Sequence, residues 1–398
     1  MDTVRWASLP EDLRVMPFNL RFMGFIGLWG VRRKVYKFLV LLIFATMVIM
    51  FPKVVLGIGS SDITVICKGV AEFVFELPNF VTLTILALKR QRFETVIQGL
   101  DDFFREVAIG EESKACYDLI RKQNNKIKKV FNFLVQYCAY GTFGFWLPAV
   151  LISHWRFWTN SDPLIFELPM EQEFYWLHIR TNFAHYHIFV GLSIFAYTAC
   201  GFFQLLKVTT TCFMIKYSSL TYRLISAKVK MLPQPTDDDQ RSKVHVQDLK
   251  KLVELHRKAY GITDMIEEIC QIPVAMEFFS CVIVWCLGMI YISQKIDINL
   301  INVMLIFSIT LLQVFGYSYL GSELAEEAEA VGKAIYDLPW YEHSVELQRF
   351  YRLIIQRTQR PTGITGVKFF IVQRTSFATV VQMSYSYYLV LKDLLNKL

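Results

Sequence analysis

The feature that most constrains this chain is its series of long apolar stretches. Seven of them have roughly the length that a helix needs to cross ~30 Å of hydrocarbon. A backbone inside lipid must satisfy its own hydrogen bonds, which a helix does within one segment. Only 19% of the residues are charged, against about 25% in soluble domains. The chain is therefore predicted to be an all-α polytopic membrane protein, with spans at about 35–56, 63–88, 130–152, 186–216, 272–292, 298–320 and 368–391.

The distribution of Lys and Arg predicts how these spans are oriented. The N-terminal segment and the segments after the second, fourth and sixth spans hold 30 of these residues, whereas the alternate segments hold 5. Short loops rich in Lys and Arg stay on the cytoplasmic side of a membrane. We therefore expect a cytoplasmic N-terminus and an extracellular C-terminus. The net charge of +7 then reflects topology rather than binding to nucleic acid.

The last span differs from the others because one of its faces carries hydroxyl groups. Pro361, Gly363 and Gly366 interrupt the chain ahead of it. Hydroxyl groups have no use on a helix that faces only lipid, but they suit a helix that meets copies of itself around a water path. One helix cannot enclose a pore, so such a face implies several subunits. The residues predicted to line the pore or its gate are Met383, Ser386, Tyr387, Val390 and Leu394.

These patterns divide the chain into a sensor, an anchor and a pore helix. Apolar residues of 344–358 repeat on one helical face, which predicts a helix that packs below the membrane. The predicted parts are a cytoplasmic N-terminal segment (1–34), a six-span ligand-sensing bundle (35–320) with cytoplasmic loops 89–129 and 217–271, a cytoplasmic helical anchor (321–362), and a pore-lining seventh helix with a short extracellular tail (363–398).

The outer halves of the middle spans predict a binding cavity. They are rich in aromatic residues, and Gly141, Gly144 and Gly191 among them leave space or allow close helix contact. An apolar cavity with a few hydroxyl or imidazole groups suits a small, neutral, hydrophobic molecule. The predicted ligand-binding residues are Phe73, Leu77, Phe143, Trp146, Val150, Tyr186, His187, Val190, Ile194, Tyr197, Met304, Phe307 and Ser308.

Three ionisable residues of the second span, Lys68, Glu72 and Glu76, lie four apart on one helical face. Charges at membrane depth face the interior of a bundle or a water-filled cavity. Two interpretations stay open at this stage. The residues form either the polar side of a ligand cavity or vestibule, or an ion pair near the outer interface that serves packing alone.

Other chemistry finds no support in the sequence. All eight cysteines fall in spans or cytoplasmic segments, so no disulfide is predicted in the outer loops. The chain has no phosphate-binding loop, no His-Glu-x-x-His motif and no nucleophile elbow. We therefore predict neither an enzyme nor a metal site nor a cofactor.

The C-terminal part resembles a known family. The run Lys333-Ala-Ile-Tyr-Asp-Leu-Pro-Trp-Tyr341, the break Gln359-Arg-Pro-Thr-Gly-Ile-Thr365 and the run Ser384-Tyr-Ser-Tyr387 are similar to the C-terminal signature of insect odorant receptors. These motifs lie within the last 66 residues, from Lys333 to Leu398. Length, span number and the predicted cytoplasmic N-terminus extend the resemblance loosely over the whole chain.

The resemblance implies an odorant-gated, non-selective cation channel in the cell membrane of olfactory sensory neuron dendrites. Odorant-binding subunits of that family form tetramers with a shared co-receptor, and odorants bind in the outer half of each bundle. The short loop 217–271 resembles that of a ligand-tuning subunit rather than the co-receptor. By its place after the tyrosine-rich signature, Val390 matches the family's hydrophobic gate, with Leu394 one turn beyond.

Two other classes of protein stay open as alternatives. A gustatory-type channel would assemble without the co-receptor and bind polar tastants, which a cavity of low polarity disfavours. A G-protein-coupled receptor would have an extracellular N-terminus, an outer-loop disulfide and an Asp-Arg-Tyr motif after its third span. This chain has the opposite charge bias and no such motif.

Overall fold

The computed structural model describes residues 10, 13–30, 34–60, 62–108, 114–159, 164–232, 239–342 and 344–397. Almost all regular structure in these ranges is helical. The helices are α2 (Pro17–Phe25), α3 (Val35–Ala45), α4 (Phe51–Val55), α5 (Ile63–Leu88), α6 (Arg90–Ala108), α7 (Lys114–Trp158), α8 (Phe183–Lys230), α9 (Asp239–Gln294), α10 (Leu300–Tyr336), α11 (Val345–Thr358) and α12 (Arg374–Leu395). A π-helical turn, Thr46–Met50, joins α3 to α4, and a 3₁₀ turn, Trp340–Glu342, precedes α11. Strands β1 (Thr365–Gly366) and β2 (Phe370–Ile371) form one antiparallel hairpin.

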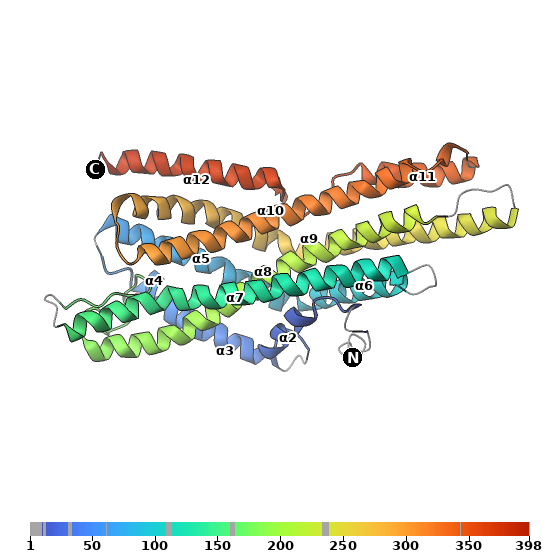
Figure 1. Ribbon diagram of the computed structural model, residues 1–398. Coiled ribbons are helices and arrows are strands. Elements are labelled where there is room, and N and C mark those ends of the chain that lie inside the picture. Colours follow the sequence, from blue (N-terminus) through green and yellow to red (C-terminus); the bar gives the residue numbers. More distant parts are fainter. Residues whose placement is uncertain are drawn as a thin grey trace.

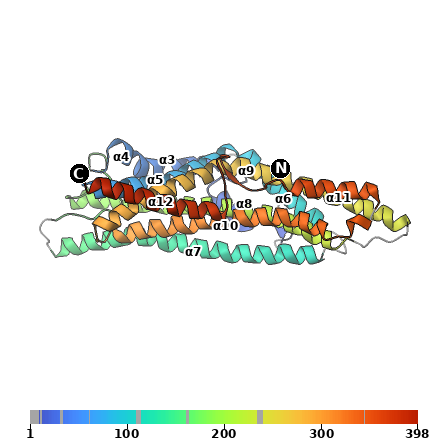
Figure 2. The same cartoon turned by 90° about the horizontal axis from the view of Figure 1, so that it is seen from above.

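The long helices give the molecule its elongated shape (Figures 1 and 2). Helix α9 has 56 residues, which corresponds to ~84 Å and is far longer than a bilayer is thick. Helices α7, α8 and α10 likewise extend beyond the predicted spans that they contain. Helix α11 and the C-terminus lie toward opposite ends of the molecule (Figure 1).

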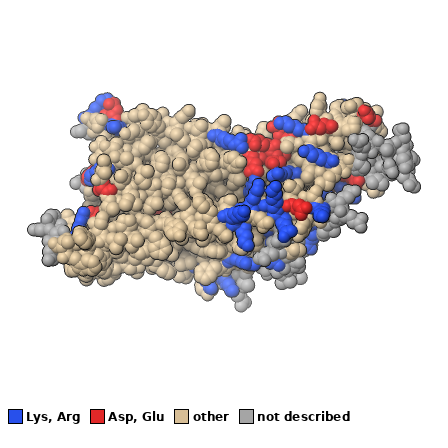
Figure 3. All heavy atoms as spheres, in the orientation of Figure 1, with Lys and Arg blue, Asp and Glu red and all other residues tan. Residues whose placement is uncertain are grey.

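Charge divides the surface into two halves. On the face drawn in Figure 3, one half is almost free of charged side chains except at its tip, whereas Lys, Arg, Asp and Glu gather on the other. Six segments of the described chain are long and apolar enough to cross a membrane, from Val35–Val55 to Leu300–Tyr336. Helix α12 is not among them, although its 22 residues span ~33 Å. Its Arg, Gln, Thr and Ser residues lower its apolar content.

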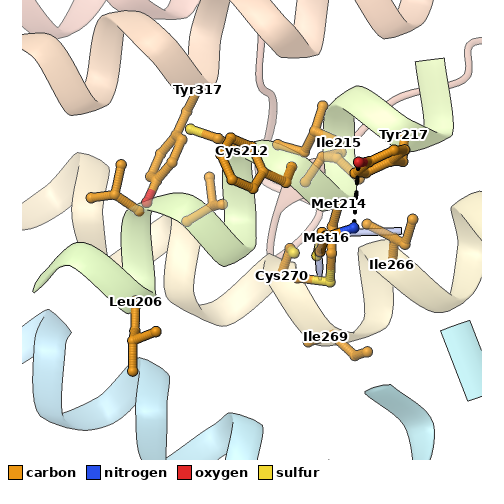
Figure 4. Packing of buried hydrophobic residues seen from close by; sticks show 14 of the residues in the cluster. Met16, Leu206, Cys212, Met214, Ile215, Tyr217, Ile266, Ile269, Cys270 and Tyr317 are labelled. Atoms are coloured by element: carbon orange, nitrogen blue, oxygen red, sulfur yellow. Dashed lines mark hydrogen bonds between the residues drawn. The ribbon is translucent and has the colours of Figure 1, made fainter. Parts of the chain in front are cut away.

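Helix α8 forms the centre of the core. It is buried on all sides over much of its length, as expected for a helix that is apolar all round. The N-terminal segment packs on it: the backbone N–H of Met16 donates to the Tyr217 hydroxyl at 3.3 Å (Figure 4). Asn19 on α2 donates to the Thr210 hydroxyl at 2.8 Å. These hydrogen bonds satisfy polar groups that burial would otherwise destabilise.

The segment between α11 and α12 determines where the last helix begins. In the β1–β2 hairpin, Val367 and Lys368 both have positive φ angles, which favours the type of turn that matches strand twist. The backbone of Val372 then passes so close to Gly321 of α10 that a Cβ on this glycine would lie 2.1 Å from the Val372 carbonyl oxygen. The Arg374 N–H donates to the Ser322 hydroxyl at 2.9 Å. The start of α12 is thus fixed against α10.

Candidate functional site

The end of the bundle that the distribution of Lys and Arg predicts to be extracellular is covered by the segment 164–180 between α7 and α8. Its apolar side chains Phe166, Leu168, Met170 and Phe174 are buried. Asn302 of α10 donates to the Pro169 carbonyl oxygen at 2.9 Å, and the Gln172 amide donates to the Val48 carbonyl oxygen at 3.1 Å. We refer to residues 164–180 as the outer lid, because they close the bundle from this end.

A network of buried ion pairs holds the outer lid in place. Lys53 binds Glu72 with 2.6 Å between Nζ and Oε2, and Lys68 binds Glu171 of the lid at 3.1 Å. Arg180 binds the other Glu171 oxygen at 2.8 Å. Lys68 also lies 3.8 Å from Glu72. These contacts favour the interpretation in which Lys68 and Glu72 serve packing. They also connect the two residues to the outer lid, a connection that the sequence alone did not reveal.

Glu171 of the lid and Asp62, just ahead of α5, both keep their charge at neutral pH. Burial raises the pKa of Glu171, but the charges of Lys68 and Arg180 and their hydrogen bonds lower it further, so the net shift is downward. Asp62, just ahead of α5, binds Lys295 and Thr64, and these contacts lower its pKa to about 2. Both carboxylates are therefore ionised and can attract their basic partners.

Below the lid, several predicted ligand-binding residues come together. Tyr186 is buried, stacks on Phe166 with 4.7 Å between ring centroids, and donates to the Glu167 carbonyl oxygen at 3.2 Å. Tyr197 is buried against Phe145 of α7, at 5.6 Å between centroids. Val190 is also buried. Phe73, Leu77, Trp146, Val150, Ile194 and Phe307 are partly buried and pack against the same core.

Buried polar groups accompany this apolar cluster at two places, at Tyr197 and Ser193 and beside Phe307. The Tyr197 and Ser193 hydroxyls lie close together and are buried with no further hydrogen-bond partner in the described ranges. Phe307 stacks on Trp285 at 4.9 Å between centroids, and it lines a small hollow of about 10 Å³ beside Lys68 and Glu72. The cluster is therefore closely packed around a few buried polar groups.

Four other predicted ligand-binding residues lie at the edge of this cluster or away from it. Phe143 and Met304 are 58% and 52% exposed and lie on the outside of the bundle. Ser308 makes a 2.9 Å hydrogen bond with Tyr137. His187 pairs with His154 at the outer end of α7 and α8. Phe143 and His187 border the cluster, because their rings lie 5.8 Å from Trp146 and 5.7 Å from Tyr186 between centroids. Met304 and Ser308 make no such ring contact with it within the described residues.

A larger, partly open cavity lies between α7, α8 and α10 and contains none of the predicted ligand-binding residues. Its volume is about 550 Å³. Gln204 and Gln313 line it and share a 2.7 Å hydrogen bond. Lys216 and Glu323, an ion pair, also line it. Sequence periodicity does not reveal this cavity, because its lining comes from three helices at different heights.

The predicted pore residues lie on a helix that packs along one side on α9 and α10 and is otherwise exposed. Within α12, which is described throughout, only Val380 and Ser384 are buried. Val390 is 59% exposed, and Figure 1 shows α12 at the edge of the bundle. Met383, Ser386, Tyr387 and Leu394 are also exposed.

Sequence reasoning missed the residues that hold the lid, namely Lys53, Glu171 and Arg180. Glu171 lies 103 residues from Lys68, and no periodic pattern connects a loop to a helix at that distance. The nearest signal was the pair Lys68 and Glu72, since buried charges require partners.

Comparison with known proteins identifies relatives. A family model described as 7tm Odorant receptor matches residues 62–385. Putative odorant receptor 92a of Drosophila melanogaster is 22% identical over 317 residues, which is 77% of this chain and 74% of that protein. The Odorant receptor coreceptor of Drosophila melanogaster is 37% identical over 84 residues, which is 21% of this chain and 17% of that protein.

Solved structures share the fold. The insect olfactory receptor OR5 from Machilis hrabei in complex with eugenol aligns with a TM-score of 0.76 and 15% identity, covering 92% of this chain and 91% of that chain. A second structure of that receptor, described without eugenol, aligns with a TM-score of 0.75 and 16% identity. The predicted all-α polytopic fold is thereby confirmed, whereas the orientation of the termini stays a prediction.

Proposed function

The chain belongs to the 7tm odorant receptor family, and we propose that it is the odorant-binding subunit of a cation channel formed with a shared co-receptor. It is a membrane receptor rather than an enzyme, as predicted from the sequence. We further propose that the assembly is a heterotetramer in the dendrites of olfactory sensory neurons.

The proposed ligand is a small, neutral, hydrophobic volatile molecule that binds in the outer half of the bundle. The cluster around Tyr186, Val190 and Tyr197 supports this choice, because it is mostly apolar and the buried Lys68 and Glu72 beside it are already ion-paired. The Tyr197 and Ser193 hydroxyls could donate to one carbonyl, hydroxyl or ether oxygen of a ligand. A charged ligand would lose its hydration there without gaining a counter-ion. The solved relative OR5 is described as a complex with eugenol, a precedent that supports the proposed ligand class.

Entry from the membrane is consistent with the lid. The outer lid is bound by Lys68 and Arg180 through Glu171, so a path from the outer solution must first break buried ion pairs. Phe143 of α7 and Met304 of α10 are exposed on the outside of the bundle, where lipid would surround it. An apolar odorant concentrates in lipid, so these residues would meet it first.

The exposure of α12 is the observation that carries the channel proposal. The face of α12 that leaves Val390 and Leu394 uncovered also exposes Ser386 and Tyr387, whose hydroxyl groups favour neighbouring subunits around a water path over lipid. Copies of α12 from four subunits around one axis would cover this face and form rings of aliphatic side chains. Such rings gate by dewetting, and small movements of the helices open them. The proposed topology has a cytoplasmic N-terminus and an extracellular C-terminus.

Whole-cell current under a panel of neutral volatiles tests the proposal. Cells that express this chain together with an insect odorant co-receptor should give an inward cation current, whereas either subunit alone should not respond to the same odorants. Absence of current from the pair, combined with an externally accessible N-terminal tag, would overturn both the channel and its topology.

A further inference from the structure

Two histidines meet at the outer end of α7 and α8. His154 lies four residues before the last residue of α7, and His187 lies four residues after the first of α8. Their Nε2 atoms are 3.1 Å apart. The ring planes cross at 84° with 5.0 Å between centroids. The two nitrogens therefore point at one another rather than stacking face to face.

Hydrogen bonds on the other ring nitrogens fix the tautomers. The Nδ1 atom of His154 lies 2.8 Å from the Val150 carbonyl oxygen, and that of His187 lies 2.8 Å from the Phe183 carbonyl oxygen. A carbonyl oxygen only accepts, so both Nδ1 atoms must carry the proton. In the neutral imidazole the other nitrogen is then a bare acceptor. Two bare Nε2 lone pairs thus face each other and need something positive between them.

We propose that His154 and His187 bind one divalent transition-metal ion of the zinc, copper(II) and nickel class. Neutral imidazole is a preferred ligand of these ions. Two nitrogens that each lie ~2.1 Å from a tetrahedral ion are ~3.4 Å apart. The observed separation of 3.1 Å differs from this by a few tenths of an ångström, which a small rotation of either ring supplies.

The surroundings support a metal ligand role. A carbonyl oxygen that accepts from Nδ1 orients the ring and raises the basicity of Nε2, as in protein metal sites generally. Both histidines are partly exposed, so an ion and water can reach them. No group of three or more His, Cys, Asp or Glu side chains suited to a metal occurs in the described ranges. Water therefore completes the coordination, and the bound ion joins α7 to α8.

A second histidine pair nearby provides a matched control. His178 and His185 have ring centroids 6.2 Å apart. Here the Nδ1 atom of His185 accepts a hydrogen bond from the His178 backbone N–H at 3.2 Å. This nitrogen is already occupied, and two free nitrogens do not face each other. The structure therefore assigns metal binding to the first pair and not to the second.

Metal binding to the purified full-length chain tests this inference without any measurement of channel activity. The protein should carry a purification tag that contains no histidine and should be reconstituted in nanodiscs at neutral pH. Copper(II) titrated by electron paramagnetic resonance should give one site per chain with coupling to two nitrogens, and zinc should compete for it.

Variants then assign the site. His154→Ala or His187→Ala should weaken binding at least tenfold, whereas the double variant His178→Ala, His185→Ala should bind as the unchanged chain does. His154→Cys should retain zinc, because a thiolate is also a zinc ligand. This variant separates loss of a ligand from loss of the fold.

Two results would overturn the inference. One is absence of copper and zinc uptake at neutral pH, which would mean that the pair shares a proton only. The other is a metal affinity of the His154→Ala and His187→Ala variants equal to that of the unchanged chain. Neither result bears on whether the chain binds an odorant.

Discussion

At two glycines of α10, replacement by alanine is predicted to have opposite effects on stability. A Cβ at Gly321 would lie 2.1 Å from the Val372 carbonyl oxygen, whereas a Cβ at Gly316 would meet nothing within 4 Å. Carbon and oxygen in close contact are ~3.3 Å apart, so Gly321→Ala forces the two backbones apart by about 1 Å. The backbone cannot yield freely, since the Val372 N–H donates to the Ile364 carbonyl oxygen at 2.9 Å.

Overpacking of this kind destabilises by about 1–3 kcal/mol. Replacing glycine by alanine in a helix adds about 1 kcal/mol of stability, and Gly316→Ala should gain this alone. We therefore expect Gly321→Ala to be less stable than Gly316→Ala by about 1–3 kcal/mol, the overpacking cost that separates the two.

Thermal unfolding in one detergent, followed by tryptophan fluorescence, measures the difference between the two variants. Gly321→Ala should melt several degrees below Gly316→Ala. It should also displace α12, which begins two residues after Val372, and reduce any odorant-evoked current. Equal or higher stability of Gly321→Ala would refute the claim that α10 fixes the start of α12.

Three further predictions concern ionisable groups. Lys207→Met should cost about 3–5 kcal/mol, because it leaves the buried Glu277 carboxylate without its partner 2.7 Å away; the double variant with Glu277→Leu should recover most of this in thermal melts. Burial raises the pKa of Asp101 from 3.8 to about 7, so the folded state binds the extra proton and stability should fall as pH rises from about 4 to 7. Asp101→Asn should flatten that pH dependence and be the more stable protein at pH 8, and unchanged melting curves from pH 5 to 8 in the unaltered chain would contradict this. Glu171→Gln should loosen the outer lid by weakening its contacts to Lys68 and Arg180, measured as faster proteolysis within 164–180, while helix content stays the same.

The apolar segments were predictable because burial in lipid imposes a continuous apolar run. Six of the seven predicted spans lie in helices that are long and apolar enough to cross a membrane, and the seventh corresponds to α12. Their ends were less predictable. The span predicted at 272–292 is the last part of Asp239–Gln294, since a helix that continues past its apolar stretch keeps its backbone conformation while its composition changes.

The candidate site shows where sequence periodicity stops being informative. A period of 3.6 residues identifies the apolar face of a helix, but most faces of a membrane helix are apolar. Tyr186 and Tyr197 are buried, whereas Phe143 and Met304 are exposed on the outside of the bundle, although the pattern treats these residues alike. The partner of His187 is 33 residues away, so only the folded chain brings the two rings together.

The central claim is that the exposed face of α12 lines a water-filled pore, and substituted-cysteine modification tests it most directly. Val390 and Val381 are 59% and 40% exposed, and nine residues of helix place them ~180° apart. Each is replaced by Cys in the chain expressed with a co-receptor, and a charged methanethiosulfonate reagent is applied from outside while odorant opens the channel. The expected result is a rapid block of current at Val390→Cys and none at Val381→Cys. Block at Val381→Cys with no effect at Val390→Cys would contradict the claim.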